Sequence, residues 1–329
     1  MLSVDSSLLK GYTFIDLFAG IGGFHYALNS FGAKCVFASE WDVYAAETYE
    51  RNFGIKPFGD ITKIKEEDIP SHDILCGGFP CQAFSISGKQ KGFDDTRGTL
   101  FFDIARIIDF HHPKIVFLEN VKNLLKHDDG KTMRVVVQTL EALGYDVFYQ
   151  ILNTSNYGLP QNRERIYIVG FRKDLNISSF SFPAPMEQSV ALLSVLESAP
   201  NAKIIDRNDI EITKQYNAGL DLFTNDIKYP NRPIQIGKVG KGGQGERIYD
   251  PIGHAITLSA YGGGVGAKTG LYLVDGVVRK LSTRECARCQ GFPEEFVINR
   301  SEQQAYKQFG NSVSINVLQL IVKQMIKCV

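Results

Sequence analysis

The first half of the chain alternates short apolar runs with segments of helical periodicity, a pattern typical of βαβ units built around a parallel sheet. Apolar residues recur at three- and four-residue spacing over 21–31, and "TMRVVVQTLEALG" at 132–144 shows the same pattern. A glycine ends each segment, as at many helix C-termini. The sequence therefore predicts an α/β fold. Its expected strands span residues 12–18, 34–40, 72–78 and 114–120, with 145–153 and 165–171 as a closing antiparallel hairpin.

The composition constrains both the partners and the compartment. The chain has 36 Lys and Arg residues against 36 Asp and Glu, so any nucleic-acid partner must be held by a local basic patch. Six cysteines among 329 residues do not indicate a disulfide framework, which favours a reducing cytoplasm. The N-terminus lacks a signal-peptide pattern, and no apolar run approaches the ~20 residues of a membrane span. We therefore expect a soluble cytoplasmic protein with no membrane partner.

The second half of the chain has a different character. Periodicity weakens over 176–232, and residues 237–270 are rich in glycine, which suits loops that approach a partner closely or flexible linkers. Interleaved apolar residues favour short strands with ordered loops, and helical patterns return near the C-terminus. "CARC" at 286–289 has zinc-like spacing, but no second ligand pair accompanies it. The sequence therefore predicts no metal site.

A glycine-rich turn, "DLFAGIGG", joins the first expected strand to the first expected helix. Such a turn lets a cofactor approach backbone amides at a helix N-terminus. Glu40 ends the next strand, where a carboxylate can bind both hydroxyls of a ribose, and Trp41 offers a face for an adenine ring. The turn would serve NAD as well, although it lacks the G-x-G-x-x-G spacing of dinucleotide sites. Asp60 is either a partner for the adenine amine or an ordinary capping acid.

A cysteine directly follows a proline in "CGGFPCQAFS". Most cysteines are structural, but Cys81 follows two glycines and Pro80 at the carboxyl end of an expected parallel strand, where open α/β sheets place their sites. We interpret Cys81 as a nucleophile that shares a crevice with Glu119, at the end of the neighbouring strand. Arg163 and Arg165 alternate along an extended segment and are expected to point to one face. Two guanidiniums there suit a base edge or phosphates, with a solvated strand edge as the alternative.

In this order, the motifs resemble those of DNA cytosine-5 methyltransferases. The matching segments are "DLFAGIGG", "GGFPCQAFS", "ENV", "QNRERIYIVGF", "RECARCQGFP" and "QFGNSV", which together cover most of residues 12–175 and 280–320. "VGKGGQGERIY" and "AITLSAYGGG" further resemble the HhaI-type members of the family, whose target is GCGC. Cys289 stands where the pattern leads us to expect an apolar residue.

The resemblance implies a doubly wound, Rossmann-like catalytic domain with a smaller glycine-rich target-recognition domain. Residues 1–193, completed by 304–329, would form the catalytic and cofactor-binding domain, 194–282 the recognition domain, and 283–303 a hinge. The enzyme would transfer the methyl group of S-adenosylmethionine to C5 of a flipped-out cytosine in double-stranded DNA, at the inner cytosine of GCGC. A companion restriction endonuclease acting on the same site would be a further partner.

The resemblance also assigns individual residues. Cys81 would add to C6 of the cytosine, Glu119 would hold N3 and the exocyclic amine, and Arg165 would lie at O2, with Arg163 organising the site. The cofactor pocket would be formed by Phe18, Gly20, Gly22, Gly23, Glu40, Trp41, Asp60, Ile61, Pro80, Leu100 and Asn311. The DNA contacts would come from Ser85, Ser87, Lys89, Arg97, Gln244, Arg247, Thr257, Tyr261 and Gly264.

Three alternatives stay open from the sequence. An NAD-dependent oxidoreductase would use the glycine turn and Glu40, but it leaves Cys81 and the paired arginines unexplained. A non-catalytic DNA-binding relative would have no need of Cys81 and Glu119 together. An RNA cytosine-5 methyltransferase of the same fold is the closer rival, and the long segment 230–280 favours duplex readout over it.

Overall fold

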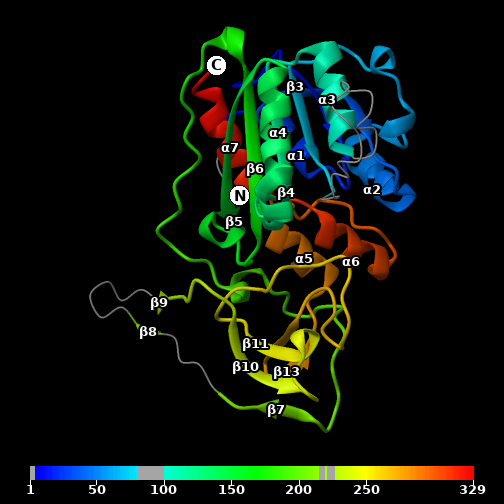
Figure 1. The fold of residues 1–329 in the computed structure, drawn as a ribbon. Helices are drawn as coiled ribbons and strands as arrows, with labels where there is room; N and C mark the ends of the chain where they lie inside the picture. The colour runs from blue at the N-terminus through cyan, green and yellow to red at the C-terminus, as the bar shows by residue number, and fades with distance from the viewer. Residues whose placement is uncertain (1–3, 81–99, 215–218, 221–226) are drawn as a thin grey trace. The chain divides into compact units, whose positions relative to one another are not determined.

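The chain forms two compact units in the computed structural model, which describes residues 4–80, 100–214, 219–220 and 227–329 (Figure 1). The first unit comprises residues 2–152, 164–183 and 318–329, and the second comprises 153–163 and 184–317. These bounds differ from the predicted domains, which place 153–163, 184–193 and 304–317 with the catalytic part. For 153–163 the difference has a local cause: residues 160–163 bond to residues 255–258 of the second unit, as described below.

A six-stranded sheet with the order β2-β1-β3-β4-β6-β5 forms the centre of the first unit. Its strands are β1 (Thr13–Leu17), β2 (Lys34–Ser39), β3 (Ile74–Gly78), β4 (Ile115–Val121), β5 (Tyr145–Asn153) and β6 (Glu164–Arg172). The pairs β1–β2, β1–β3 and β3–β4 are parallel, whereas β6 is antiparallel to β4. The structure confirms the six predicted strands and places β5 beside β6, as expected for consecutive strands of a hairpin.

Helices cover both faces of this sheet. They are α1 (Gly23–Ser30), α2 (Val43–Phe53), α3 (Leu100–His111), α4 (Lys131–Ala142) and the part of α7 (Ile315–Ile326) that belongs to the first unit. Alternation along β4 shows the two faces. Val116 and Leu118 join the hydrophobic core that α3 and α4 cover, and these two helices lie side by side (Figure 1). Phe117 points the other way and meets Phe24 of α1, with ring centroids 5.1 Å apart. The predicted doubly wound α/β class is confirmed.

The second unit contains a smaller sheet of five strands, ordered β13-β12-β11-β10-β7. These strands are β7 (Ile210–Ile212), β10 (Ile234–Val239), β11 (Arg247–Asp250), β12 (Leu271–Val274) and β13 (Val277–Arg279). A separate pair joins β8 (Gly219–Leu220) to β9 (Ile227–Lys228). Two helices follow the sheet, α5 (Thr283–Gln290) and α6 (Glu302–Asn311), as predicted from the returning helical pattern. A core of aliphatic side chains, including Val239, Ile248 and Leu271, holds the sheet together.

Within the described part of the chain, no helix is long and apolar enough to pass through a membrane. The same residues contain no group of three or more His, Cys, Asp or Glu side chains that could hold a metal ion. The "CARC" segment lies on α5, where Cys286 and Cys289 are buried.

Candidate active site

The glycine-rich turn follows β1 and leads into α1. Gly20 and Gly22 have φ angles of 56° and 84°, a region that favours glycine. A Cβ added at Gly22 would lie 2.1 Å from Cε2 of Phe53 on α2, so the turn also needs glycine for lack of space. The turn is held from the next strand, because the Gly20 N–H donates to Oε2 of Glu40 over 2.8 Å. The sequence placed Glu40 beside this turn, and the structure brings them together.

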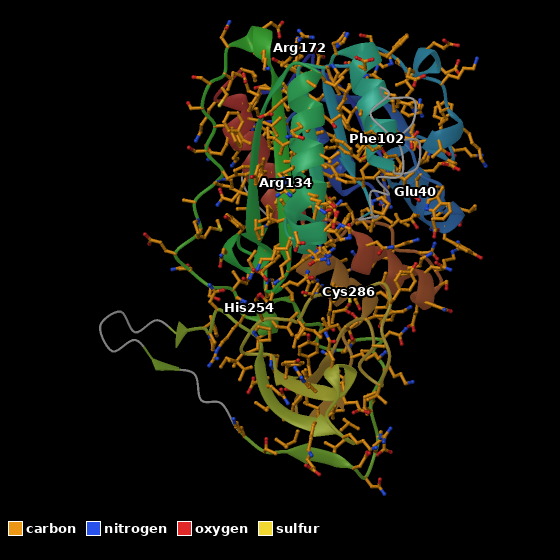
Figure 2. The ribbon with its side chains drawn as sticks, viewed as in Figure 1. Glu40, Phe102, Arg134, Arg172, His254 and Cys286 are labelled. Carbon is orange, nitrogen blue, oxygen red and sulfur yellow. The ribbon has the colours of Figure 1, made fainter. Side chains whose placement is uncertain are left out.

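Glu40 comes directly after β2 (Figure 2), and its second oxygen, Oε1, accepts the N–H of Asp42 over 2.8 Å. Burial raises the pKa of the Glu40 carboxyl, while the N–H donors of Asp42 and Gly20 partly offset that rise. Each carboxylate oxygen can accept more than one hydrogen bond, so the side chain retains capacity for two hydroxyls of a ligand. Trp41 follows at once and is 79% exposed, which leaves its ring available to a partner.

The loop that carries Asp60 is tied to the same end of β2. The Glu40 N–H donates to the carbonyl of Phe58 over 2.8 Å, and Ser39 Oγ donates to that of Gly59 over 2.8 Å. Asp60 caps the short 3₁₀ turn Ile61–Lys63 by accepting from Thr62, whose hydroxyl lowers the pKa of the carboxyl. Both interpretations of Asp60 therefore stay open. It caps the 3₁₀ turn, and it also lies on a segment bonded to Glu40, where it could meet an adenine amine.

Arg106 of α3 fixes that loop, a role that the sequence analysis missed. Its Nη2 donates to the carbonyl of Ile61 over 2.7 Å. Glu66 and Asp103 hold the same guanidinium at 2.8 Å and 2.9 Å. The role was missed because Ile61 and Glu66 lie 45 and 40 residues before Arg106, and no sequence pattern marks them as its partners. Phe18, Ile61 and Leu100 themselves lie after β1, at the start of the 3₁₀ turn and at the start of α3.

His25, on α1, allows a test of this part of the fold through pH. Burial lowers its pKa to about 4, from an ordinary value of 6.5, and its Nδ1 lies 2.6 Å from the hydroxyl of Tyr49. Between these pKa values the unfolded chain binds a proton that the folded chain does not, so stability falls as the pH falls. We expect this residue to lower the free energy of unfolding by about 2 kcal/mol between pH 7 and pH 5.

Urea unfolding followed by the fluorescence of Trp41, the one tryptophan of the chain, would measure that change. His25→Gln should be less stable at pH 7 because it loses packing, but its stability should change less between pH 7 and pH 5. Equal pH dependence in the two proteins would contradict the assignment.

Glu119 and Arg165 form an ion pair at the carboxyl end of β4. Arg165 Nε lies 3.0 Å from Glu119 Oε1, and the two side chains are 14% and 9% exposed. The register explains the contact: Arg165 on β6 pairs with Val121, two residues beyond Glu119 on the antiparallel partner. Glu119 also pairs with Gly78, the last residue of β3. Two residues to which the sequence analysis gave separate roles are therefore in direct contact.

Asn120 connects this edge of the sheet to Phe79, which lies two residues before Cys81. Its Nδ2 donates to the carbonyl of Phe79 over 2.8 Å, and its Oδ1 accepts the N–H of Val121 over 2.8 Å. Asn120 is 2% exposed. The side chain thus fixes the backbone just before Pro80. The sequence analysis quoted "ENV" without giving the asparagine a role, although an amide directly after Glu119 at the end of an expected strand was a usable signal.

Several predicted site residues fall outside the described part of the chain. These are Cys81 and the expected DNA contacts Ser85, Ser87, Lys89 and Arg97. Pro80 is the last described residue before them and follows the buried Phe79.

Arg163 and Arg165 belong to different units. Arg163 belongs to the second unit, is 2% exposed, and donates to backbone carbonyls of that unit. Arg165 lies on β6 in the first unit and pairs with Glu119. Arg165 is the second residue of β6, whereas Arg163 precedes the strand, which begins at Glu164. That alternation directs both guanidiniums to one face stays a prediction.

The predicted DNA contacts in the second unit are exposed. Gln244 lies in a 3₁₀ turn before β11, and Arg247 is the first residue of β11. The backbone at Gly245 packs against the loop that contains Gly264: a Cβ at Gly245 would lie 2.1 Å from the carbonyl of Gly263. Gly266 N–H donates to the carbonyl of Gly245 over 2.7 Å. The two glycine-rich segments are therefore one surface, whose exposed predicted contacts are Gln244, Arg247, Thr257, Tyr261 and Gly264.

Comparisons with known proteins agree on one family. The family model of C-5 cytosine-specific DNA methylases matches residues 12–327. The type II methyltransferase M.HhaI of Haemophilus parahaemolyticus is 56% identical over 324 residues, covering 98% of this chain and 96% of the relative. M.HpaII of Haemophilus parainfluenzae, also a type II methyltransferase, is 44% identical and covers 98% and 91%.

Solved structures share the fold at lower identity. The S. pombe Dnmt2 methyltransferase superposes with a TM-score of 0.68 at 21% identity, covering 96% of this chain and 98% of that one. The Spodoptera frugiperda DNMT2 mutant gives a TM-score of 0.71 at 17% identity, covering 96% and 99%. These likenesses support the doubly wound architecture.

Proposed function

The chain belongs to the C-5 cytosine-specific DNA methylase family and methylates cytosine at C5 in DNA, and we propose that it modifies the inner cytosine of GCGC through a covalent adduct with Cys81. The family decides against an NAD-dependent oxidoreductase. The observation that carries the residue assignment is the buried Glu119–Arg165 pair beside the Asn120–Phe79 bond, at the edge from which the chain continues to Pro80 and Cys81.

The chemistry follows from the inertness of cytosine C5. Addition of the Cys81 thiolate to C6 makes the ring an enamine, and its C5 then has the electron pair needed to take a methyl group. Glu119, held by Arg165, would bind N3 and the exocyclic amine as charge develops, and Arg165 would contact O2. Loss of the C5 proton returns the electron pair and expels the thiolate. A stacked base offers no access to either face, so the cytosine must be flipped out.

The family implies S-adenosylmethionine as the methyl donor, which supplies an electrophilic methyl group on a sulfonium. The residues beside the glycine turn fit such a ligand. Glu40 presents a fixed carboxylate to ribose hydroxyls, Trp41 offers an exposed ring to adenine, and the Asp60–Ile61 segment is bonded to the same strand end. We propose that Phe18, Gly20, Gly22, Gly23, Pro80, Leu100 and Asn311 complete the set of cofactor residues.

Bisulfite sequencing of duplex DNA treated with the protein and S-adenosylmethionine would test this function. We expect conversion-resistant cytosines at the inner position of GCGC on both strands. A different four-base context would leave the enzyme class standing and contradict the target. Methylation of structured RNA in preference to duplex DNA would favour the RNA-modifying alternative. Because the curated relatives are type II methyltransferases, we also propose a companion endonuclease for the same site, from which methylated DNA would be protected.

Arg247→Ala should relax the choice of sequence as well as weaken binding. Arg247 is exposed at the start of β11, and an arginine can pair with O6 and N7 of guanine in the major groove. One such contact is worth ~1–3 kcal/mol of discrimination. Methylation rates on GCGC and on duplexes with one substituted base would measure the change.

Lys89→Ala is the matched comparison for a contact to phosphate. It should weaken binding to all sequences alike and reduce the salt dependence of affinity by the loss of one cation. If Arg247→Ala instead weakened all sequences equally, Arg247 would be a phosphate contact.

A further inference from the structure

The guanidinium of Arg163 bonds to backbone at two separate places in the second unit. Nη1 donates to the carbonyl of Leu258 over 3.1 Å. Nη2 donates to the carbonyls of Gly310 and Ser312 over 3.2 Å and 2.5 Å. Two nitrogens of one planar group therefore fix three carbonyls, a geometry that suits arginine and not lysine.

Gly310 and Ser312 mark one of these two places, the end of α6. Gly310 and Ser312 flank Asn311, the last residue of the helix and a proposed cofactor ligand. A Cβ at Gly310 would lie 2.2 Å from the carbonyl carbon of Ser259, so the end of the helix packs directly against the backbone of the segment after Leu258. The turn that carries Asn311 is thus held by Arg163 on one side and by close backbone contact on the other.

The second place is the segment that carries the predicted DNA contacts Thr257 and Tyr261. Leu258 is held through both of its peptide groups: its N–H donates to Oε1 of Gln161 over 3.1 Å, and its carbonyl accepts from Arg163. Thr257 Oγ1 donates to the carbonyl of Asn162 over 2.6 Å. The Gln161–Arg163 segment therefore fixes the position of residues 257–258 through hydrogen bonds that involve all three of its residues.

We propose that Arg163 is a positioning residue that sets both the Asn311 turn and the 257–261 segment, so that cofactor affinity and base discrimination depend on one buried side chain. This role gives a physical form to the predicted part of Arg163 in organising the site. It rests on the proposed function, in which Asn311 binds the cofactor and Thr257 and Tyr261 contact DNA. Neither ligand has to touch Arg163 for the effect, because the guanidinium acts through the backbone carbonyls that it orients.

Arg163→Lys tests the proposal, since it keeps the positive charge and removes the planar fork. Two quantities are measured: the Kd of S-adenosylmethionine for the DNA-free enzyme, by isothermal titration, and the ratio of kcat/KM between GCGC and a duplex with one substituted base. We expect the Kd to rise about tenfold and the ratio to fall about tenfold, each the effect of one misplaced hydrogen-bonded contact. A variant that lost kcat alone, with Kd and ratio unchanged, would place Arg163 at the reacting base and overturn the proposal.

Two matched variants separate the effect on cofactor affinity from the effect on base discrimination. They remain informative if Arg163→Lys does not fold. Gln161→Leu removes the acceptor for Leu258 N–H and should lower the discrimination ratio with the cofactor Kd unchanged. Gln290→Leu removes the donor to Phe309 and Ser312 carbonyls and should raise the cofactor Kd with the ratio unchanged. Identical effects of the two variants, or no effect of either, would contradict the claim that the Asn311 turn sets cofactor affinity and the 257–261 segment sets base discrimination.

The wild-type protein distinguishes this proposal from the proposed function. Absence of GCGC methylation by the wild-type protein would overturn the proposed function. Normal wild-type methylation, together with unchanged Kd and ratio in Arg163→Lys, would overturn the positioning role alone.

Discussion

Cys81→Ser is expected to abolish methyl transfer while leaving the affinity for S-adenosylmethionine nearly unchanged. A serine hydroxyl does not ionise near neutral pH, so it cannot add to C6 of the cytosine as a thiolate does. Most of the proposed cofactor residues, by contrast, lie on the glycine turn and the Glu40 and Asp60 segments, and the substitution changes none of the proposed set, although Pro80 is adjacent to it. Single-turnover methylation and isothermal titration of the same preparation would measure both quantities.

DNA containing 5-fluorocytosine should trap the wild-type enzyme as a covalent adduct, because fluorine cannot leave C5 as a proton does. Peptide mapping should find the adduct at Cys81. Three of the other cysteines are poor nucleophiles: Cys76, Cys286 and Cys289 are buried, and burial raises the pKa of each thiol. An adduct at any of these three would contradict the assignment, and Cys81→Ser should give none.

The sequence predicted the sheet of the first unit well because its strands are short, apolar and bounded by clear breaks. The helices were less readable. In α2 the buried residues are Ala45, Thr48 and Tyr49, which leave a weak apolar stripe. Its better signals were at the ends, where Asp42 caps the first turn and Gly54 stops the last. In α3 the buried residues Phe101, Ile104 and Ile108 do recur at helical spacing, so this helix carried a signal that the sequence analysis did not use.

Some residues of the candidate site could be placed from the sequence and others could not. Glu119 could be placed beside the end of β3 because the carboxyl ends of neighbouring parallel strands meet at one edge of a sheet. The partners of Arg163 could not be predicted, because they are backbone carbonyls 95 to 149 residues further along the chain. Every residue offers such an acceptor, so the sequence contains no mark that distinguishes Leu258 or Ser312. The start of β6 at Glu164, which separates Arg163 from the strand, was likewise not marked in the sequence.

Glu119→Gln is expected to slow methyl transfer by roughly 10²–10⁴-fold, the contribution typical of a lost acid–base group. The amide keeps the size of the side chain but cannot be the anion that pairs with Arg165 or the acid that neutralises developing charge on the base. Because Glu119 is buried at the strand end, solvent cannot replace it. Single-turnover rates at saturating DNA and cofactor would isolate the chemical step from binding.

Glu164, the residue before Arg165, offers a matched control for that substitution. Glu164 begins β6 and forms an ion pair with Lys122, but its side chain is 40% exposed. Exposed ion pairs contribute about 0–1 kcal/mol, so Glu164→Gln should leave the rate of methyl transfer close to that of the wild-type enzyme. Each variant removes one carboxylate from an ion pair that involves β6, and the two carboxylates differ in burial. Equal rates for the two variants would show that Glu119 serves the fold and not the reaction.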